Sequence, residues 1–233
     1  MKSLKERISD KYGSALSLYS SPLLTPLENY NGWFLPQEEA VVKKACDKRK
    51  VDFLTGRYCA RKAIDCLLSE EKKNDSNSLF IPVSPNRAPL WPKHIVGSIT
   101  HTDGYCASVT GLKEKILSVG IDGQVMKPGR ITEGMKKMIL SECEMADGET
   151  MLNLIFSAKE SLYKCLNPLV KRFFGFHTAK VTEINGHEQT FTIKIIDSNL
   201  KKEAEKHCCT SSFKGLYCIS EQVVVTLIVF ESI

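Results

Sequence analysis

The hydrophobic pattern of this chain passes twice through the same order, from helical segments to strands. Apolar side chains such as Phe53, Ile64 and Leu67 recur at helical spacing in the first half, over residues 38–68. Strand patterns follow it at residues 96–99, 105–109 and 116–121. The second half has helical patterns at residues 132–143 and 151–166, and strand patterns at residues 180–184, 190–196 and 223–230. This order predicts an α+β fold of two similar lobes, residues 1–116 and 117–233, with a candidate site in the cleft between them.

Several connecting segments carry turn signals. The first forty residues are expected to form loops around one or two short strands, and Asp52 is a plausible N-cap for the later part of the first helix. Residues 72–78 are expected to be a polar turn, residues 79–83 a short strand and residues 85–92 a stiff, proline-rich loop. Asn185-Gly186 predicts a hairpin turn.

Composition indicates a soluble globular protein. The chain has 233 residues, of which 42% are hydrophobic and 25% charged, so it is long enough to bury a core without covalent staples. The formal net charge of +5 is compatible with an acidic partner or a phosphorylated ligand. This excess is too small to require nucleic acid, and nucleic-acid binding is not expected.

The cysteines and the termini indicate a cytoplasmic protein. Nine cysteines are scattered without a C-x-x-C pair, so zinc spacing is absent and we expect reduced thiols. The N-terminus lacks the apolar core of a signal peptide. The longest apolar run, residues 223–230, is far too short to span a bilayer, so no stable membrane insertion is expected.

Two acids are candidates for a metal site. Asp122 is expected at the end of a strand, and Glu160 lies on the helix predicted from residue 151. If they converge, two carboxylates with phosphate oxygens and waters would form a typical Mg²⁺ site. The alternatives are that Asp122 is a turn residue and that Glu160 is a solvated partner of Lys164, at the favourable i, i+4 spacing.

Basic residues near these acids suggest a phosphate ligand. Arg57 and Arg61 are four positions apart and Arg49 lies two turns upstream, so they can present planar donor forks to a phosphate. His101 follows small residues and can donate to a phosphate oxygen or accept a proton. Lys159 and Lys164 flank Glu160 and can neutralise charge on a leaving oxygen. A solvated basic helix face, a structural histidine and exposed lysines are the alternatives.

Three ordered motifs together resemble the 4′-phosphopantetheinyl transferase superfamily, in its pseudo-dimeric type that activates siderophore and nonribosomal peptide synthetases. The motifs are Gly97-Ser98-Ile99-Thr100-His101, then residues 120–124, which begin Gly-Ile-Asp, and residues 156–164, which read Phe-Ser-Ala-Lys-Glu-Ser-Leu-Tyr-Lys. The helix around residues 53–61 and the Pro89-Leu90-Trp91-Pro92 segment are also similar to that family. The resemblance covers roughly residues 45–170, and the three motifs in order are specific where any one alone is weak.

The resemblance implies a reaction. Coenzyme A binds between the lobes, a serine of an apo acyl or peptidyl carrier protein attacks its β-phosphate, and adenosine 3′,5′-bisphosphate leaves. The enzyme then needs no nucleophile of its own, and positioning and charge neutralisation dominate. The expected site residues are Asp122 and Glu160 as Mg²⁺ ligands (Mn²⁺ is the alternative ion), Glu160 as the base, Lys164 at the leaving side, Ser98 and His101 at the phosphates, and Arg49, Arg57, Arg61 and Arg87 at the 3′-phosphate or adenine side.

One position departs from the family pattern. The second acid that often follows the aspartate is Gln124 here, a neutral and poorer Mg²⁺ ligand. Three alternatives stay open: water fills that position, Gln124 coordinates weakly, or the metal affinity is lower. This departure keeps open an alternative function, a coenzyme A-binding sensor or scaffold with impaired catalysis. A nucleic-acid-binding module that uses Arg49, Arg57 and Arg61 would leave both acids unexplained.

The partner implied by the resemblance is a carrier protein with an acidic surface, which the basic balance would attract. Residues 132–137 with Arg130, Lys136 and Lys137 could present such a face. Internal pairing of two lobes predicts a monomer. The sequence does not distinguish siderophore, polyketide, fatty-acid or polyunsaturated-lipid synthases as the source of the carrier.

Overall fold

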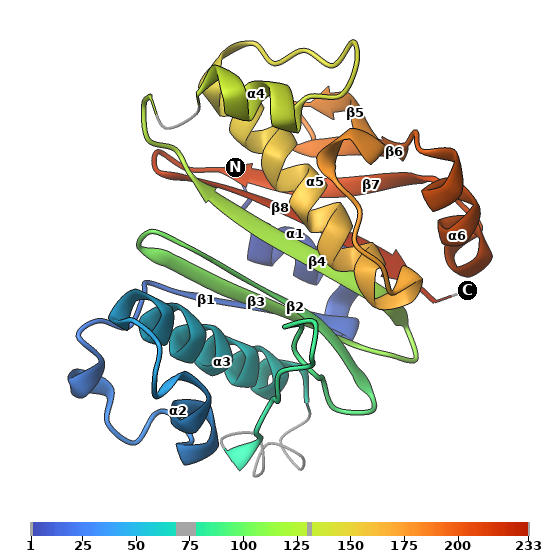
Figure 1. Cartoon of the computed structure of the whole chain (residues 1–233). Coiled ribbons are helices and arrows are strands. Elements are labelled where there is room, and N and C mark those ends of the chain that lie inside the picture. Colours follow the sequence, from blue (N-terminus) through green and yellow to red (C-terminus); the bar gives the residue numbers. More distant parts are fainter. Residues whose placement is uncertain (1, 69–77, 130–131, 233) are drawn as a thin grey trace. The chain divides into compact units, whose positions relative to one another are not determined.

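A long helix on an antiparallel sheet recurs in each of two units of the chain (Figure 1). The first unit contains Met1–Leu117 and Ser232–Ile233, and the second contains Ser118–Glu231. The computed structural model describes residues 2–68, 78–129 and 132–232. None of the helices within these residues is long and apolar enough to cross a membrane.

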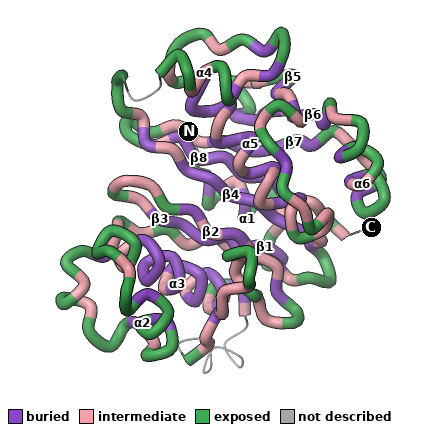
Figure 2. Tube along the Cα trace, viewed as in Figure 1, coloured by how far each residue is buried: buried purple, intermediate pink, exposed green. Residues whose placement is uncertain are grey.

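The first unit is built on a three-stranded sheet with the order β1-β3-β2. Its elements are α1 Leu4–Tyr12, β1 Leu16–Ser21, α2 Pro36–Val42, α3 Asp47–Leu67, β2 Ile95–Thr102 and β3 Tyr105–Leu112. A capping box between Ser3 and Glu6 begins α1, because each side chain accepts a hydrogen bond from the backbone N–H of the other residue. The long helix α3 is buried over most of its second half, which fixes it against the sheet (Figure 2).

The second unit has a five-stranded sheet with the order β4-β8-β7-β6-β5. Its elements are β4 Ile116–Val125, which begins just before the boundary, α4 Glu133–Ile139, α5 Gly148–Val170, β5 Ala179–Asn185, β6 Thr190–Ile195, α6 Ser198–Cys208, β7 Ser212–Ile219 and β8 Val223–Glu231. Side chains of α5, α6 and the strands form one continuous apolar core. Figure 1 shows α5 running across one face of this sheet, with α6 beside it.

The α+β class and the two-lobe arrangement are confirmed, but several segments differ from the expectations. Helix α1 was missed, and residues 38–68 form two helices rather than one. Asp52 is not an N-cap, because α3 already begins at Asp47. Residues 79–83 form no strand, only an isolated bridge between Val83 and Pro89. Pro82 lacks the N–H that a strand pairing requires.

In the second unit the predicted hairpin is confirmed, since β5 and β6 are antiparallel neighbours on either side of Asn185-Gly186. Helix α6 and strand β7 were missed.

Two expected strand ends, one in each unit, were also wrong, and both affect candidate residues. Strand β2 continues to Thr102, so His101 is in a strand rather than a turn, and β4 continues to Val125, so Asp122 lies within its strand. Of the expected polar turn at residues 72–78, all but Ser78 lies outside the described residues.

Candidate functional site

The first unit contains a small basic pocket of about 130 Å³. Helix α3, the loop before β2 and strand β2 each contribute to it. Its lining comprises Arg49, Asp52, Phe53, Gly56 and Arg57 from α3, Val83, Arg87 and Pro89 from the loop, and Ile99 and His101 from β2. The structure thus brings together four of the predicted ligand-binding residues, three of which are arginines.

Arg57 is held rigidly in this pocket. Its Nε donates a 2.9 Å hydrogen bond to the Ile81 carbonyl, and its guanidinium lies 4.6 Å from the centroid of the Phe53 ring. Burial lowers the pKa of Arg57 to about 10, partly offset by the negative charge of Glu38, while Arg49 and Arg61 lower it further. The side chain is 5% exposed, so the alternative of a solvated basic face is wrong for this residue. A fixed, dehydrated cation is suited to an anionic ligand.

His101 and Arg87 reach the pocket from outside α3. The Nδ1 atom of His101 lies 3.6 Å from Asp52 Oδ2, which orients the ring at the end of β2. Arg87 lies in a turn in which its backbone N–H donates to the Ser84 carbonyl. Its backbone φ of +66° is rare for a residue other than glycine. This turn lies at the start of the loop predicted for residues 85–92, and its stiffness stays a prediction.

Two other predicted residues do not line this pocket. Arg61 is 2% exposed, ion-paired with the fully buried Glu38, and donates a 2.5 Å hydrogen bond to the Trp33 carbonyl. Ser98 is adjacent in sequence to Ile99, and successive side chains of a strand point to opposite faces, so Ser98 faces away from Ile99 and His101. A ligand role for either residue stays a prediction that this pocket does not support.

In the second unit, four predicted residues converge where α5 packs on β4. Lys164 Nζ donates to Asp122 Oδ1 at 2.7 Å and to the Ile121 carbonyl at 3.0 Å. Gln124 Nε2 donates to Asp122 Oδ2 at 2.7 Å. Asp122 therefore lies within a strand and not in a turn, and Lys164 forms an ion pair with it. The alternative that Asp122 is a turn residue is therefore wrong, whereas the charge of Lys164 does act on Glu160 as the second alternative supposed.

Glu160 belongs to the same cluster. Burial raises its pKa, the negative charge of Asp122 raises it further, and Lys164 partly offsets both effects. The charge of Asp122, on β4, thus acts on Glu160, on α5, although the two residues are 38 positions apart in the sequence. A pair of carboxylates that repel each other is stabilised when a cation lies between them.

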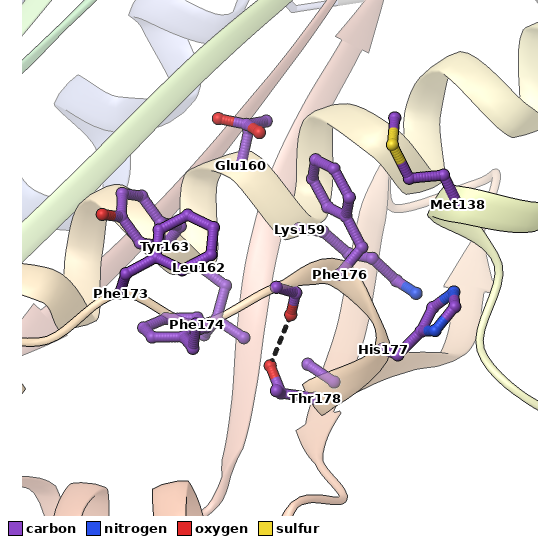
Figure 3. Close-up of a pocket in the computed structure, with 12 residues that line it drawn as sticks. Met138, Lys159, Glu160, Leu162, Tyr163, Phe173, Phe174, Phe176, His177 and Thr178 are labelled. Atoms are coloured by element: carbon purple, nitrogen blue, oxygen red, sulfur yellow. Dashed lines mark hydrogen bonds between the residues drawn. The ribbon is translucent and has the colours of Figure 1, made fainter. Parts of the chain in front are cut away.

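Lys159 does not share the cluster with its neighbour Glu160. Its Nζ is buried and donates to Glu144 Oε2 at 2.5 Å, the Ile139 carbonyl at 2.7 Å and Ser141 Oγ at 2.9 Å. Burial lowers the pKa of Lys159, and Glu144 opposes this shift. Figure 3 shows Lys159 and Glu160 leaving α5 in different directions. The hypothesis that Lys159 neutralises a leaving phosphate is therefore not supported by its contacts.

The oxygen donors of the cluster suit a magnesium ion. Asp122 and Glu160 supply two carboxylates and Gln124 an amide oxygen, while Mg²⁺ generally takes one or two protein carboxylates plus waters and substrate phosphates. No group of three or more His, Cys, Asp or Glu side chains with metal-binding geometry occurs among residues 2–68, 78–129 and 132–232. The donor set therefore fits a cation that also depends on a phosphate ligand.

An apolar pocket of about 500 Å³ lies beside Glu160 (Figure 3). Helix α5 and the segment after it form its walls, and Met138 of α4 contributes to the rim. The lining comprises Met138, Lys159, Glu160, Leu162, Tyr163, Phe173, Phe174, Gly175, Phe176, His177, Thr178 and Ala179. Phe156, the aromatic residue of the third motif, packs edge-on against Phe176 at 5.3 Å between ring centroids. The pocket offers mainly apolar surface to an uncharged group.

The residues that support the site were missed by sequence reasoning. Glu38, Asp52 and Glu144 are buried acids that orient Arg61, His101 and Lys159. No spacing rule connects them, because each contact joins segments brought together only by the fold. The one available signal is that an acid in an otherwise apolar pattern, such as Asp52 within the helical run 51–64, generally needs a partner.

Comparison with known proteins gives a consistent result for both units. Residues 37–111 match the sequence model of the 4′-phosphopantetheinyl transferase N-terminal domain, and residues 118–228 match that of the 4′-phosphopantetheinyl transferase superfamily. The chain is 29% identical over 228 residues to the 4′-phosphopantetheinyl transferase PptT of Mycobacterium tuberculosis, covering 91% of this chain and 89% of that protein.

Two further relatives are similar over shorter spans. The 4′-phosphopantetheinyl transferase Svp of Streptomyces mobaraensis is 30% identical over 204 residues, 83% of this chain and 77% of the relative. Enterobactin synthase component D of Salmonella typhi is 31% identical over 160 residues, 65% of this chain and 62% of the relative. The matched segments include the basic pocket of the first unit and the Asp122 cluster of the second.

Proposed function

The chain belongs to the 4′-phosphopantetheinyl transferase superfamily, as a transferase of the type that activates siderophore and nonribosomal peptide synthetases, and on that premise we propose its substrates and chemistry. It transfers the 4′-phosphopantetheine group of coenzyme A to a serine hydroxyl of an apo acyl or peptidyl carrier protein, with Mg²⁺. Adenosine 3′,5′-bisphosphate is the other product.

The observation that carries this proposal is the cluster of Asp122, Lys164 and Glu160, with Gln124 beside it. Transfer of a phosphoryl-type group depends mainly on positioning and on neutralising charge, and this cluster combines two acids with a fixed cation. The nucleophile is the serine of the carrier, so the chain needs no nucleophile of its own. The P–O bond to the serine oxygen forms as the bond to the bisphosphate oxygen breaks.

Glu160 is the proposed base. A base works best when its pKa approaches the working pH, and burial together with Asp122 shifts the pKa of Glu160 upward. Directly or through one water, its carboxylate takes the proton of the serine hydroxyl. Lys164, already held by Asp122 and the Ile121 carbonyl, stabilises charge on the leaving side.

Asp122 and Glu160 would hold the Mg²⁺ ion, with Gln124 as a weaker third ligand. When bound, the ion would neutralise negative charge on the diphosphate. The hydrogen bonds from Lys164 and Gln124 fix both oxygens of Asp122 in the absence of metal, which preserves the orientation of this acid.

The two pockets match the two chemically different parts of coenzyme A. The basic pocket with Arg49, Arg57, Arg87 and His101 suits the phosphorylated nucleotide end, because arginine forks bind phosphate oxygens bidentately. The apolar pocket beside Glu160 suits the uncharged pantetheine chain.

The second substrate is proposed to be an acidic carrier protein in siderophore or other secondary metabolism. Helix α4 carries Lys136 and the exposed Lys137, and the exposed Met138 adds an apolar contact. Arg130, also predicted for this face, lies outside the described residues. We further propose that the protein acts as a monomer in the cytoplasm, where its nine free cysteines would stay reduced.

A labelling assay tests this function. The protein is incubated with coenzyme A, Mg²⁺ and several apo carriers, and the carrier mass is measured. We expect a gain of one phosphopantetheine on at least one carrier. Loss of the base in Glu160→Gln should reduce the rate at least about a hundredfold. The exposed Glu142 provides the matched control, since Glu142→Gln makes the same change at a residue outside the cluster.

Folding must be monitored in the same variants. Because the pKa of Glu160 is raised, its ionisation weakens the folded state as pH rises through that pKa. Glu160→Gln should therefore unfold no more easily than the parent protein at neutral pH. Binding of coenzyme A without transfer to any carrier would support the sensor alternative. Parent-like turnover in Glu160→Gln would exclude Glu160 as the base.

A further inference from the structure

A buried group of hydroxyls joins α5 to the sheet directly behind the Asp122 cluster. Ser157, Ser161 and Thr226 are all 0% exposed. Thr226 Oγ1, on β8, lies 2.9 Å from Ser157 Oγ and 2.7 Å from Ser161 Oγ, both on α5. Ser157 Oγ also donates to the Asp122 backbone carbonyl at 3.0 Å. Thr226 thus links α5, the helix of Glu160 and Lys164, to β8, and Ser157 links the same helix to β4, the strand of Asp122.

The direction of these hydrogen bonds follows from counting protons. A carbonyl can only accept, so the single proton of Ser157 points to the Asp122 carbonyl. The proton shared between Ser157 and Thr226 must then come from Thr226. Ser161 consequently donates to Thr226, through either its Oγ1 or its carbonyl, which lies 3.0 Å away. When Ser161 donates to Thr226 Oγ1, a directed chain runs from Ser161 through Thr226 and Ser157 to the Asp122 carbonyl; when Ser161 donates to the Thr226 carbonyl, the chain begins at Thr226.

The backbone approaches closely at the same place. A Cβ atom at Gly120 would lie 2.0 Å from the Ser161 carbonyl oxygen and 2.6 Å from the Cys165 amide nitrogen. Two residues before Gly120 on β4, Ser118 Oγ donates a 2.5 Å hydrogen bond to the Cys165 carbonyl of the same helix. Helix α5 therefore rests on β4 with backbone contact rather than through long, adaptable side chains.

We infer that Thr226 is a positioning residue for the reaction, because its hydroxyl holds α5 on β8, the sheet neighbour of β4, and keeps Ser157 at the Asp122 carbonyl, which together set the spacing of Glu160 and Lys164 from Asp122. This inference rests on the proposed function. Thr226 lies outside all three sequence motifs. Because Thr226 is fully buried, it touches no substrate. It acts through Ser157 and Ser161, which lie on the same helix as Glu160 and Lys164.

A buried threonine in the first unit gives a matched contrast. Thr110, in the central strand β3, is also 0% exposed, yet within the described part of the chain its Oγ1 has no hydrogen-bond partner. Replacing either threonine by valine keeps the branched shape and removes only the hydroxyl. Thr110→Val therefore measures the effect of the chemical change itself, and Thr226→Val adds the loss of the hydroxyl chain.

Thr226→Val leaves every remaining hydroxyl with an acceptor. Ser157 can still donate to the Asp122 carbonyl, and Ser161 can still donate to the carbonyl of residue 226. We therefore expect a folded protein whose melting temperature falls by about 2–4 °C. Small errors in position are costly in catalysis, so kcat should fall roughly tenfold or more while the KM for coenzyme A stays within about twofold. Thr226→Ser should restore most of kcat.

Two assays separate this inference from the proposed function. Carrier labelling gives kcat, KM and the Mg²⁺ concentration for half-maximal rate in the parent, Thr226→Val, Thr226→Ser and Thr110→Val. Calorimetry with Mn²⁺ in the presence of coenzyme A measures ion binding without turnover, and Thr226→Val should bind Mn²⁺ at least about threefold more weakly. Parent protein that labels no carrier would reject the function, whereas the Mn²⁺ titration still tests Thr226.

Three results would overturn the positioning role. The first is a Thr226→Val variant with parent kcat and parent Mn²⁺ affinity. The second is an equal loss in Thr226→Ser, which would assign the effect to the methyl group. The third is an equal loss of kcat in Thr110→Val.

Discussion

Helices α3 and α5 use their cations in a similar way, although they belong to different units. Each has one cation in a buried ion pair, Arg61 with Glu38 in α3 and Lys159 with Glu144 in α5. Each has a second cation at a candidate site, Arg57 in the basic pocket and Lys164 at Asp122. The buried pairs differ in their support, because Glu144 also accepts backbone N–H bonds from Ser141 and Val181, whereas among the described residues Glu38 has a single backbone donor, Leu35.

This comparison shows that residue type and helical spacing do not assign a role to a cation. Arg57 and Arg61 are four positions apart, and Lys159 is adjacent to the proposed base. In each case the partner acid decides, and it comes from another segment, 23 positions away for Arg61 and 15 for Lys159. The following variants test how far the parallel between the helices extends.

The largest effect is expected from breaking the buried pairs. Arg61→Met and Lys159→Met each leave a buried carboxylate without its cation, which typically costs roughly 3–5 kcal/mol of unfolding free energy. Arg61→Met should lose more, because Glu38 keeps one backbone donor whereas Glu144 keeps two. Urea unfolding of both variants measures the difference.

The double variants Arg61→Met/Glu38→Gln and Lys159→Met/Glu144→Gln provide the control, since removing both charges should recover part of the loss. Equal stability of single and double variants would argue against a buried charge as the cause. Arg61→Met that remains folded should also keep its KM for coenzyme A. A large rise in KM would instead support the prediction that Arg61 binds the ligand.

A moderate effect is expected in the basic pocket. Arg49→Ala and Arg87→Ala each remove a charge from its lining, and neither residue is buried. The KM for coenzyme A should rise about tenfold with kcat changed little, since these contacts serve binding in the ground state and the transition state alike. Lys44→Ala, an exposed residue outside the pocket lining, is the control. If KM stays constant in both arginine variants, this pocket does not bind the nucleotide end.

The smallest effect is expected at Gln124. Gln124→Glu adds an acid next to Asp122, so the apo protein should melt slightly lower, and Mg²⁺ with coenzyme A should raise its melting temperature more than in the parent protein. The Mg²⁺ concentration for half-maximal rate should fall by about threefold to tenfold, because a carboxylate is a better ligand than an amide. An unchanged Mg²⁺ dependence would place residue 124 outside the metal site.

The sequence predicted the class of the fold, which depends on local patterns. It singled out the residues that meet at Asp122 and four of the residues that line the basic pocket, but it also singled out Arg61 and Ser98, which do not line that pocket. Periodicity located α3, α5 and most strands, and the motifs included Asp122, Glu160 and Lys164. Helix α1 was missed since its nine residues have only Leu4 and Ile8 buried, too few for a clear period. Strand β2 was ended too early because His101 and Thr102 look like turn residues, although both pair with β3.

The orientation of side chains could not be predicted in the same way. The faces of Ser98 and His101 depend on where β2 truly ends, and the partners of Arg61 and Lys159 depend on long-range packing. Thr226 has no sequence signal at all, since a threonine within the apolar run 223–230 is ordinary for a strand. Its contacts appear only once α5 lies across β8.

The missing side chain at Gly120 has an evolutionary consequence. Even the methyl group of alanine would overlap the main chain of α5, so any mutation there separates the acid on one element from the acid on the other. A drifting copy of the gene could therefore lose its chemistry through a single added carbon while both acids remain in its sequence. Homologues that retain both carboxylates but have a larger residue at this position are the ones to suspect of having become inactive.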